Sequence, residues 1–397
     1  MKIIKVLLIV ILIISPFPIG YMLIERSFLT SFKPHLFHGD IPVNEIPDNY
    51  YQKNRGFYFE IPDGPSKGSR LFYHDTVYGD GPPLNTIIFV HGNPASSYIF
   101  TDTITRLETM TTLPVRVIAM DLIGFGLSDR ASAQLSPWDH ADNLLQLITY
   151  LDLSNITLVV HDWGGPVGIG ALLHIPETVS GLVLINTTVF KLTSVDIIFN
   201  PYKVSVFGNS PLVSFIPDFS WGKYSMYAIF TRPGSPFLDR LGFIRNLVWP
   251  SQNRMTEINP KEIQFYTNHL RSRQNIINSR LFYKDALYFS ASHTLPDSAA
   301  QRSMDEFIGF IDSHLSGKWG PAGANIRVFG LFGDQDVLSD PVFTDKWLTA
   351  LPQLNGHLKI IEKGGHYLQK EHPEIVAGAI INVITQINAA HTGVDGP

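Results

Sequence analysis

Residues 156–165 read ITLVVHDWGG, and this stretch decides the fold class of the chain. Its first five residues form a compact apolar run of the kind that a buried parallel strand requires, and a helical pattern begins just after it. Asp162 therefore stands at the apex of a tight turn between a strand and a helix, the arrangement called a nucleophile elbow. Gly164 supplies a small residue beside the apex, whereas Val160 occupies a position where glycine is usual when the apex is serine. A carboxylate at this apex can attack a carbon atom and form an ester, which divides one difficult displacement into two easier steps.

Short apolar or aromatic runs alternate with helical patterns on both sides of this turn, which predicts a mostly parallel sheet flanked by helices. Strands are expected at residues 57–61, 71–78, 86–90, 115–120, 156–160, 181–185, 326–332 and 358–362, and helices over 137–152, from about 341, and from 372 to about 387. The alternation stops after Asn186 and resumes at Ile326. The intervening stretch, which contains many aromatic residues and prolines, predicts an inserted, largely helical cap.

The length and composition fit one α/β core with a sizeable insertion. The chain has 397 residues, of which 45% are hydrophobic and 16% charged, and this is enough to bury a large core. The predicted organisation is an N-terminal hydrophobic segment at 1–26, a proline-containing tether at 27–54, the first part of the core at 55–190, the helical cap at 191–315 and the second part of the core at 316–397.

The N-terminal segment has the pattern of a membrane anchor or an export signal. Lys2 and Lys5 precede an unbroken apolar run at residues 6–14, and apolar character continues to Ile24. This length is marginally enough to cross a bilayer, and the preceding lysines hold the N-terminus in the cytoplasm, so that the folded domain is expected outside it. A cleaved signal peptide with its apolar part at residues 6–14 is the alternative, and a buried hydrophobic helix is the third interpretation.

Charge and composition exclude several classes of function. The formal net charge is -5 and no run of Lys or Arg is present, so no nucleic-acid partner is expected. The absence of cysteine excludes disulfides, thiolate metal sites and a cysteine nucleophile. No metal-binding histidine motif and no phosphate-binding glycine loop occurs, so we expect no metal and no cofactor. The expected partners are a small apolar substrate, water, and a membrane through the N-terminal segment.

The second half of the chain offers a histidine and a carboxylate that suit an ester intermediate. His366 follows the last predicted strand and two glycines, in a loop that can present its ring over the sheet. A base in this place can activate the water that attacks the ester, and a carboxylate is needed to orient and stabilise its imidazolium. Asp336, just after the strand at 326–332, is the expected acid, and Asp334 competes for the same role. The order nucleophile, acid, histidine is that of the α/β-hydrolase fold.

A further part of the site is expected at the end of the third predicted strand. The sequence His91, Gly92, Asn93 turns the chain so that the amide of Asn93 can point at the nucleophile and form an oxyanion site with the amide of Trp163. The side chains of Asn93 and Trp163 are both hydrogen-bond donors, so they can also hold an anion that leaves the substrate carbon, such as a halide. His91 and His161 flank turns and are expected to be structural.

Four stretches of the chain together resemble the haloalkane dehalogenases. They are HGNPASSYIF at residues 91–100, DLIGFGLSD at 121–129, HDWGG at 161–165 and GGHYLQKEHPE at 364–374. The resemblance covers the core from about residue 57 to 390 and excludes the N-terminal segment and most of the cap. The four stretches are specific in combination, although each alone would be a weak signal.

This resemblance implies Asp162 as nucleophile, His366 as base, and Asn93 with Trp163 as the halide-binding pair. One branch of the family uses a glutamate just after the strand that precedes the cap. This chain has Asn186, Thr187 and Thr188 there. The resemblance therefore points to the branch in which the acid follows the next strand, at Asp336.

The resulting hypothesis is hydrolytic dehalogenation of haloalkanes through an alkyl ester of Asp162, with release of halide and an alcohol. An epoxide hydrolase is the nearest rival, since that family shares the aspartate nucleophile, the HDWGG turn, the acid and the histidine. It also needs two cap tyrosines, for which the candidates are Tyr202, Tyr224, Tyr227, Tyr266, Tyr283 and Tyr288. Asn93 argues against it, because an aromatic residue is usual at that position in epoxide hydrolases. A membrane-tethered binding protein that keeps the fold without turnover is a third interpretation.

Overall fold

A computed structural model describes residues 46, 47, 49, 50, 55–191, 265, 273–284 and 304–392. The predicted anchor or signal segment, most of the tether and most of the cap lie outside these residues, so the predictions for them remain predictions. Within the described part of the chain, no helix is both long enough and apolar enough to span a bilayer.

The strands of the described chain form one eight-stranded sheet in the order β1-β2-β4-β3-β5-β6-β7-β8. Their bounds are Gly56–Glu60 (β1), Arg70–Tyr78 (β2), Asn85–Val90 (β3), Val115–Met120 (β4), Ile156–His161 (β5), Val179–Ile185 (β6), Arg327–Gly333 (β7) and Leu358–Ile361 (β8). Strand β2 pairs antiparallel with β1 and with β4, and the other neighbouring strands pair in parallel. Every strand expected from the sequence is present, and the prediction of a mostly parallel sheet is confirmed.

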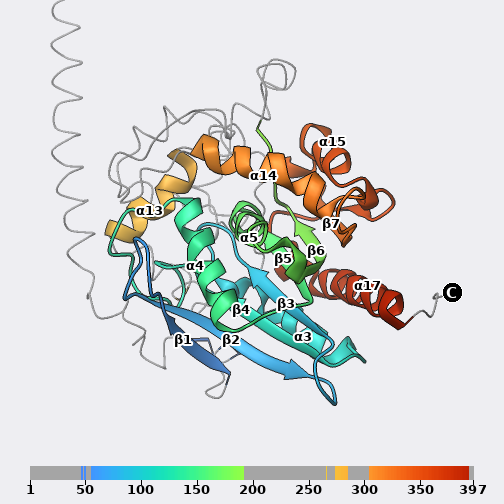
Figure 1. Ribbon diagram of the computed structural model, residues 1–397, viewed down its shortest axis with the longest axis horizontal. Coiled ribbons are helices and arrows are strands. Elements are labelled where there is room, and N and C mark those ends of the chain that lie inside the picture. The colour runs from blue at the N-terminus through green and yellow to red at the C-terminus, as the bar shows by residue number, and fades with distance from the viewer. Residues whose placement is uncertain are drawn as a thin grey trace, which may run out of the picture.

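Helices cover both faces of this sheet (Figure 1). Their bounds are Thr101–Met110 (α3), Pro137–Tyr150 (α4), Gly164–Leu172 (α5), Arg273–Lys284 (α13), Met304–Trp319 (α14), Pro341–Ala350 (α15), Leu368–Glu371 (α16) and Pro373–Thr392 (α17), with short 3-10 helices at Ser97–Phe100, Pro176–Thr178, Val337–Ser339 and Pro352–Leu354. Helices α4, α5 and α14 pack together on one face, whereas α3 packs with α17 on the other. In the predicted cap, the structure describes α13, residues 304–315 of α14, and the single residues Lys191 and Phe265.

The core has two layers because successive side chains of a strand point to opposite faces of the sheet. In β3, Ile88 and Val90 join the apolar cluster beneath α4 and α5, whereas Ile87 and Phe89 join the cluster beneath α3 and α17. All four side chains are at most 1% exposed. This double burial explains why the parallel strands appear in the sequence as unbroken apolar runs instead of alternating ones.

The start of α4 shows how the sequence fixes an element that flanks the site. Ser136 accepts a hydrogen bond from the backbone amide of Asp139 at 3.2 Å, and the Asp139 carboxylate accepts one from the amide of Ser136 at 2.7 Å. Pro137 occupies the first turn, where its missing N–H costs nothing. The helix therefore begins at the residue that the sequence predicted.

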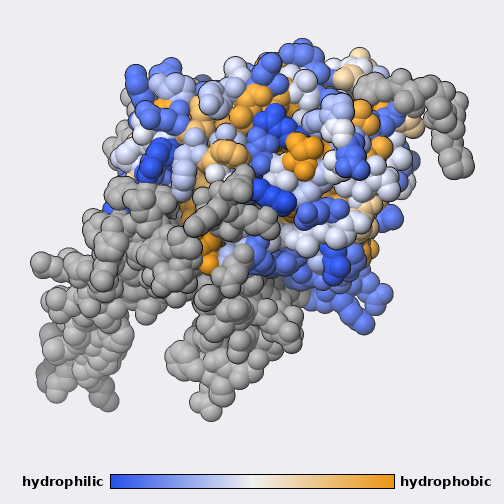
Figure 2. All heavy atoms as spheres, turned by 90° about the horizontal axis from the view of Figure 1, so that it is seen from below, coloured by the Kyte–Doolittle hydropathy of each residue, from blue (hydrophilic) through white to orange (hydrophobic). Residues whose placement is uncertain are grey.

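The surface of the described chain mixes apolar and hydrophilic side chains. On the face shown in Figure 2, hydrophobic residues are interspersed with hydrophilic ones. The exposed large hydrophobic residues of the described chain are Phe57, Tyr58, Val77, Leu84, Met110, Tyr150, Ile360 and Ile375. Scattered residues of this kind are normal on a protein surface, so they point to no particular partner.

Parallel pairing brings the carboxyl ends of β3, β5, β6, β7 and β8 to the same edge of the sheet. In open α/β sheets, ligands bind at this edge. The residues that the sequence singled out as reactive all follow one of these strands, and the topology therefore predicts that they meet.

Candidate active site

Asp162 occupies the turn between β5 and α5 in a left-handed backbone conformation, with φ of 52°. Non-glycine residues adopt this conformation at a cost, so surrounding contacts must hold it. The carbonyl oxygen of Asp162 accepts hydrogen bonds from the amide of Gly165 at 3.0 Å and from Oγ1 of Thr187 at 2.6 Å. These bonds stabilise the nucleophile elbow that the sequence predicted and leave the carboxylate directed away from the strand.

The close approach of α5 to β5 depends on a glycine in the helix, Gly168, and not on a glycine in the strand. A Cβ atom built on Gly168 of α5 would lie 2.9 Å from Cγ1 of Val160. Glycine at position 168 therefore lets α5 approach β5 while Val160 keeps its branched side chain, which explains the departure noted in the sequence.

The backbone of Asn93 is hydrogen-bonded to the carboxylate of Asp162. The Asn93 N–H donates to Oδ1 of Asp162 at 2.9 Å. The preceding Gly92 permits this approach, because a Cβ atom there would lie 2.4 Å from both Cβ and Oδ1 of Asp162. An amide in this place can stabilise negative charge that develops on the nucleophile's oxygen, as the oxyanion prediction requires.

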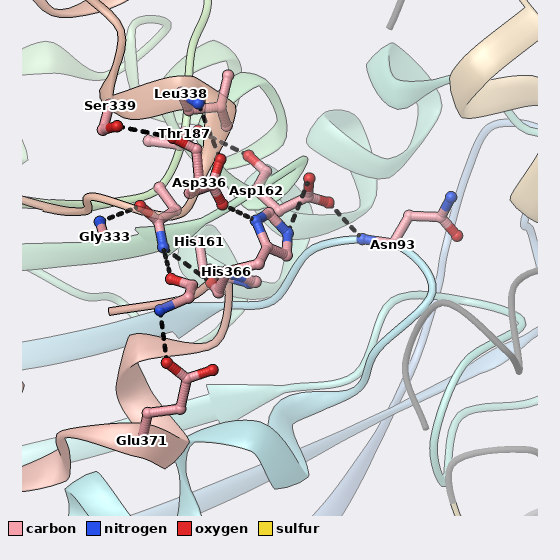
Figure 3. A network of polar contacts seen from close by, with 12 residues as sticks. Asn93, His161, Asp162, Thr187, Gly333, Asp336, Leu338, Ser339, His366 and Glu371 are labelled. Atoms are coloured by element: carbon pink, nitrogen blue, oxygen red, sulfur yellow. Dashed lines mark hydrogen bonds and ion pairs between the residues drawn. The ribbon is translucent and has the colours of Figure 1, made fainter. Parts of the chain in front are cut away.

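His366 lies between two carboxylates, Asp162 and Asp336 (Figure 3). Its Nε2 is 3.5 Å from Oδ2 of Asp162, and its Nδ1 is hydrogen-bonded to Oδ2 of Asp336. The other carboxylate oxygen of Asp336 accepts a hydrogen bond from the amide of Leu338 at 2.8 Å. Asp336 is 3% exposed, whereas Asp334, the competing candidate, is exposed to solvent. The structure thus brings Asp162, His366 and Asp336 together.

The charges around His366 determine its protonation. Burial acts to lower its pKa, but the charges and hydrogen bonds of Asp336 and Asp162 outweigh burial and raise the pKa to about 10. The imidazole is therefore protonated at neutral pH. Loss of the charge on Asp162 would lower this pKa, because one of the two groups that raise it would be gone.

Asn186, at the end of β6, links the loops that carry the acid and the base. Its Nδ2 donates to the carbonyl oxygens of Gly365 and His366 at 2.8 and 2.9 Å, and its Oδ1 accepts from the amide of Gly333 at 2.9 Å. Glu371 stabilises the segment around His366 itself, since its carboxylate accepts from the amide of Gly365 at 2.6 Å. Figure 3 shows Gly333 and Glu371 on the side of His366 remote from Asn93.

His91 and His161 lie in structural positions, as expected from the sequence. Nε2 of His161 donates to the carbonyl oxygen of His366 at 2.8 Å, and Nε2 of His91 accepts from the amide of Leu122 at 3.0 Å. Burial lowers the pKa of both rings, in the case of His161 to about 3, so both are neutral at ordinary pH. A neutral His161 adds no second positive charge beside His366.

The side chains expected to hold a halide both contact the cap helix α13. Nδ2 of Asn93 donates to the carbonyl oxygen of Ser279 at 2.9 Å, and Oγ of Ser279 donates to Oδ1 of Asn93 at 2.8 Å. Figure 3 shows the Asn93 side chain extending away from the Asp162 carboxylate. The Trp163 indole packs edge-on against Phe282, with ring centroids 5.4 Å apart. The structure therefore joins the backbone of Asn93 to the carboxylate of Asp162, and its side chain to helix α13.

Sequence reasoning did not identify Asn186, Glu371 or Ser279 as parts of the site. Asn186 drew attention only because it is not a glutamate, although its place at the carboxyl end of a parallel strand was a usable signal. Glu371 lies inside the stretch GGHYLQKEHPE, where the histidine drew the attention. No sequence signal connects Ser279 with Asn93.

The comparisons with known proteins agree with this geometry. Residues 85–373 match the model of the alpha/beta hydrolase fold family. Since the match covers most of the chain, the protein belongs to the α/β hydrolase fold family. The sheet order, the elbow at Asp162 and the placement of Asp336 and His366 fit that assignment.

The chain is similar to curated relatives of two named activities. A haloalkane dehalogenase of Mycolicibacterium paratuberculosis is 37% identical over 36% of this chain and 48% of its own length. A cis-3-alkyl-4-alkyloxetan-2-one decarboxylase of Shewanella oneidensis is 37% identical over 32% of this chain and 38% of its own length. The chain thus matches less than half the length of either relative.

Two crystallographic neighbours extend the likeness of fold to a larger part of the chain. A loop variant of a haloalkane dehalogenase from Bradyrhizobium elkanii superposes with a TM-score of 0.55 at 20% identity, over 86% of this chain and 99% of its own. A tetrameric haloalkane dehalogenase from Paraglaciecola agarilytica gives a TM-score of 0.56 at 20% identity, over 87% of this chain and 96% of its own. At this identity the likeness shows the fold alone.

Proposed function

We propose that the protein is a hydrolase that removes halide from haloalkanes through a covalent ester of Asp162. The observation that carries this proposal is the position of the Asp162 carboxylate between the amide of Asn93 and the imidazole of His366. A carboxylate in the place where a serine would stand favours attack on a carbon that bears a leaving group. The haloalkane dehalogenase relatives support the choice of a halide.

In the first step, an oxygen of Asp162 attacks the carbon that carries the halogen. A carbon–oxygen bond forms, the carbon–halogen bond breaks, and the halide leaves with the bonding electron pair. The raised pKa of His366 places a protonated imidazole beside the attacking carboxylate, with Nε2 3.5 Å from Oδ2 of Asp162. Oδ1 remains next to the Asn93 amide as the carbonyl oxygen of the ester.

In the second step, water hydrolyses the ester. Esterification removes the charge of Asp162, so the pKa of His366 falls and the ring releases its proton to solvent. Nε2 then takes a proton from water, and the resulting hydroxide attacks the ester carbonyl carbon. The negative charge that develops on Oδ1 is stabilised by the Asn93 amide, and Asp336 stabilises the imidazolium. Collapse of the intermediate breaks the bond between the carbonyl carbon and the alkyl oxygen, and the hydroxyl proton of the intermediate passes to that oxygen. The alcohol then leaves, and the Asp162 carboxylate is restored.

A second candidate is decarboxylation of a cis-3,4-dialkyl oxetan-2-one, which would yield an alkene and carbon dioxide. The decarboxylase of Shewanella oneidensis and the dehalogenase of Mycolicibacterium paratuberculosis are each 37% identical to the matched part of this chain. This reaction releases no halide, so it does not require the side chains of Asn93 and Trp163 as ligands of an anion. The same aspartate and histidine could serve such a reaction.

One experiment separates these reactions from each other and from an epoxide hydrolase. Purified protein is incubated in parallel with 1-bromohexane, styrene oxide and a cis-3,4-dialkyl oxetan-2-one, and bromide, diol and carbon dioxide are measured. We expect release of bromide with an equal amount of hexanol. Release of carbon dioxide alone would identify the protein as a decarboxylase. Formation of diol alone would identify it as an epoxide hydrolase. Failure to convert any of the three would favour the binding protein without turnover.

A further inference from the structure

Helix α13 meets the core through a face that is unusually polar. Asn278 and Ser279 lie three and four residues after Asn275, and Phe282 lies four and three residues after them, so all four share one side of the helix. Each is at most 1% exposed. A buried helix face is ordinarily apolar, so three polar residues here indicate that hydrogen bonds determine how this helix is placed.

The two asparagines bind the core segment that precedes α4. Oδ1 of Asn275 accepts a hydrogen bond from the amide of Ala131 at 3.2 Å. Oδ1 of Asn278 accepts from the amide of Leu135 at 3.3 Å, while its Nδ2 donates to the carbonyl oxygen of Ala133 at 3.0 Å. Backbone groups of the core therefore fix both the position of α13 and its rotation about its own axis.

Held in this way, Ser279 binds the carboxamide of Asn93 through two of its own atoms. Its carbonyl oxygen accepts from Nδ2 at 2.9 Å, and its hydroxyl donates to Oδ1 at 2.8 Å. A half-turn of the carboxamide would place Oδ1 against the Ser279 carbonyl, where two acceptors would face each other. The pair is buried, with Asn93 3% exposed and Ser279 fully covered, so water cannot easily replace either bond.

We infer that Ser279 is a positioning residue that sets the orientation of the Asn93 carboxamide and thereby the selectivity of the site among leaving groups. The inference rests on the proposed function, because it concerns the anion that departs in the first step. Phe282, one helical turn from Ser279, packs against Trp163, the other expected halide ligand. Helix α13 therefore contacts the side chains of both Asn93 and Trp163.

The orientation of the Asn93 carboxamide should matter most for the rate with a substrate that has a poor leaving group. Chloride departs less readily than bromide, so its departure depends more on a donor that is correctly oriented in the transition state. Replacing Ser279 by alanine removes the hydroxyl that holds Oδ1 and leaves the orientation of the carboxamide less defined. We expect the ratio of kcat/KM for 1-chlorohexane to that for 1-bromohexane to fall about tenfold, and the inhibition constant of bromide to rise by a similar factor.

The test compares wild type, Ser279→Ala, Ser279→Thr and Ser313→Ala. Ser279→Thr keeps the hydroxyl and should keep the ratio near that of wild type. Ser313→Ala removes an exposed serine of α14 and should change nothing. The ratio of the two kcat/KM values does not depend on how much of a variant is folded, so loss of stability cannot imitate the effect.

The outcomes distinguish this inference from the proposed function. A wild type that releases bromide, together with an unchanged ratio and an unchanged bromide constant in Ser279→Ala, overturns the role of Ser279 alone. An equal loss in Ser279→Thr and Ser279→Ala also overturns it, because the hydroxyl would then not matter. A wild type that releases no halide from either substrate overturns the proposed function and this inference together.

Discussion

Nε2 of His366 lies 3.5 Å from Oδ2 of Asp162, on the side of the ring opposite the hydrogen bond with Asp336. The imidazole therefore stands between the proposed nucleophile and the proposed acid and responds to the charge of both. Its pKa, which Asp336 and Asp162 raise to about 10 against the effect of burial, should fall once Asp162 is esterified. His366 can in this way stand as a positively charged group beside Asp162 in the first step and act as the base in the second.

The two candidate acids can be separated by matched substitutions. Asp336→Asn removes the charge that stabilises the imidazolium, so hydrolysis of the ester should slow by about a hundredfold or more. Asp334→Asn makes the same chemical change at an exposed position and should leave the rate near that of wild type. Single-turnover measurement of alcohol release reports this step directly. A larger loss in Asp334→Asn would reassign the acid.

The close approach at Gly92 makes this position intolerant of a side chain. Alanine there would place Cβ 2.4 Å from Cβ and Oδ1 of Asp162, so the carboxylate or the Asn93 amide must move. A displacement of this size should lower kcat/KM by about a hundredfold. The matched control is Gly309→Ala in α14, where a Cβ meets nothing within 4 Å. That variant should gain about 0.5–1 kcal/mol in the free energy of unfolding and keep its activity. Full activity in Gly92→Ala would contradict the geometry described for the site.

Asn186 should affect catalysis through the loops that it joins. Asn186→Asp keeps the size of the side chain but turns the donor toward the carbonyls of Gly365 and His366 into an acceptor. We expect kcat to fall about tenfold to a hundredfold, because the loop that carries the base is displaced. Asn382→Asp, an exposed substitution in α17, should have no such effect. Comparison of steady-state rates for the two variants tests this role, and equal rates would refute it.

The buried ring of His140 predicts a loss of stability in mild acid. Burial lowers its pKa to about 3, and neither ring nitrogen has a hydrogen-bond partner in the structure. As the pH falls below the ordinary value of 6.5, the unfolded state takes up a proton that the folded state does not, so the contribution of His140 to stability is lost on acidification. At pH 5.5 the resulting loss in the free energy of unfolding is about 1.4 kcal/mol.

His140→Phe should abolish that contribution, since the ring already lies beside Phe125 and Phe282. The measurement is urea unfolding of both proteins at pH 7.5 and 5.5. The variant should lose about 1.4 kcal/mol less than wild type between the two pH values. An equal loss in both proteins would show that His140 is protonated in the folded state.

The sequence predicted the sheet well because its parallel strands are buried on both faces and therefore appear as unbroken apolar runs. It also predicted that Asp162, Asp336 and His366 would meet, since each follows the carboxyl end of a parallel strand. It favoured Asp336 as the acid but did not exclude Asp334, because two residues of one short loop differ mainly in the direction of their side chains. The contact of Asn93 with Ser279 could not be predicted either, since it joins residues 186 positions apart through a helix whose rotation depends on hydrogen bonds to the core.

The covalent ester on Asp162 is the central claim, and trapping it is the most direct test. His366→Gln removes the base of the second step and leaves the nucleophile in place. After incubation with 1-bromohexane, intact mass spectrometry of this variant should show the addition of one hexyl group, and peptide mapping should place that group on Asp162. Wild type should show no lasting adduct. An unmodified His366→Gln protein, or an adduct on another residue, obtained with a substrate that wild type converts, would contradict the proposed mechanism.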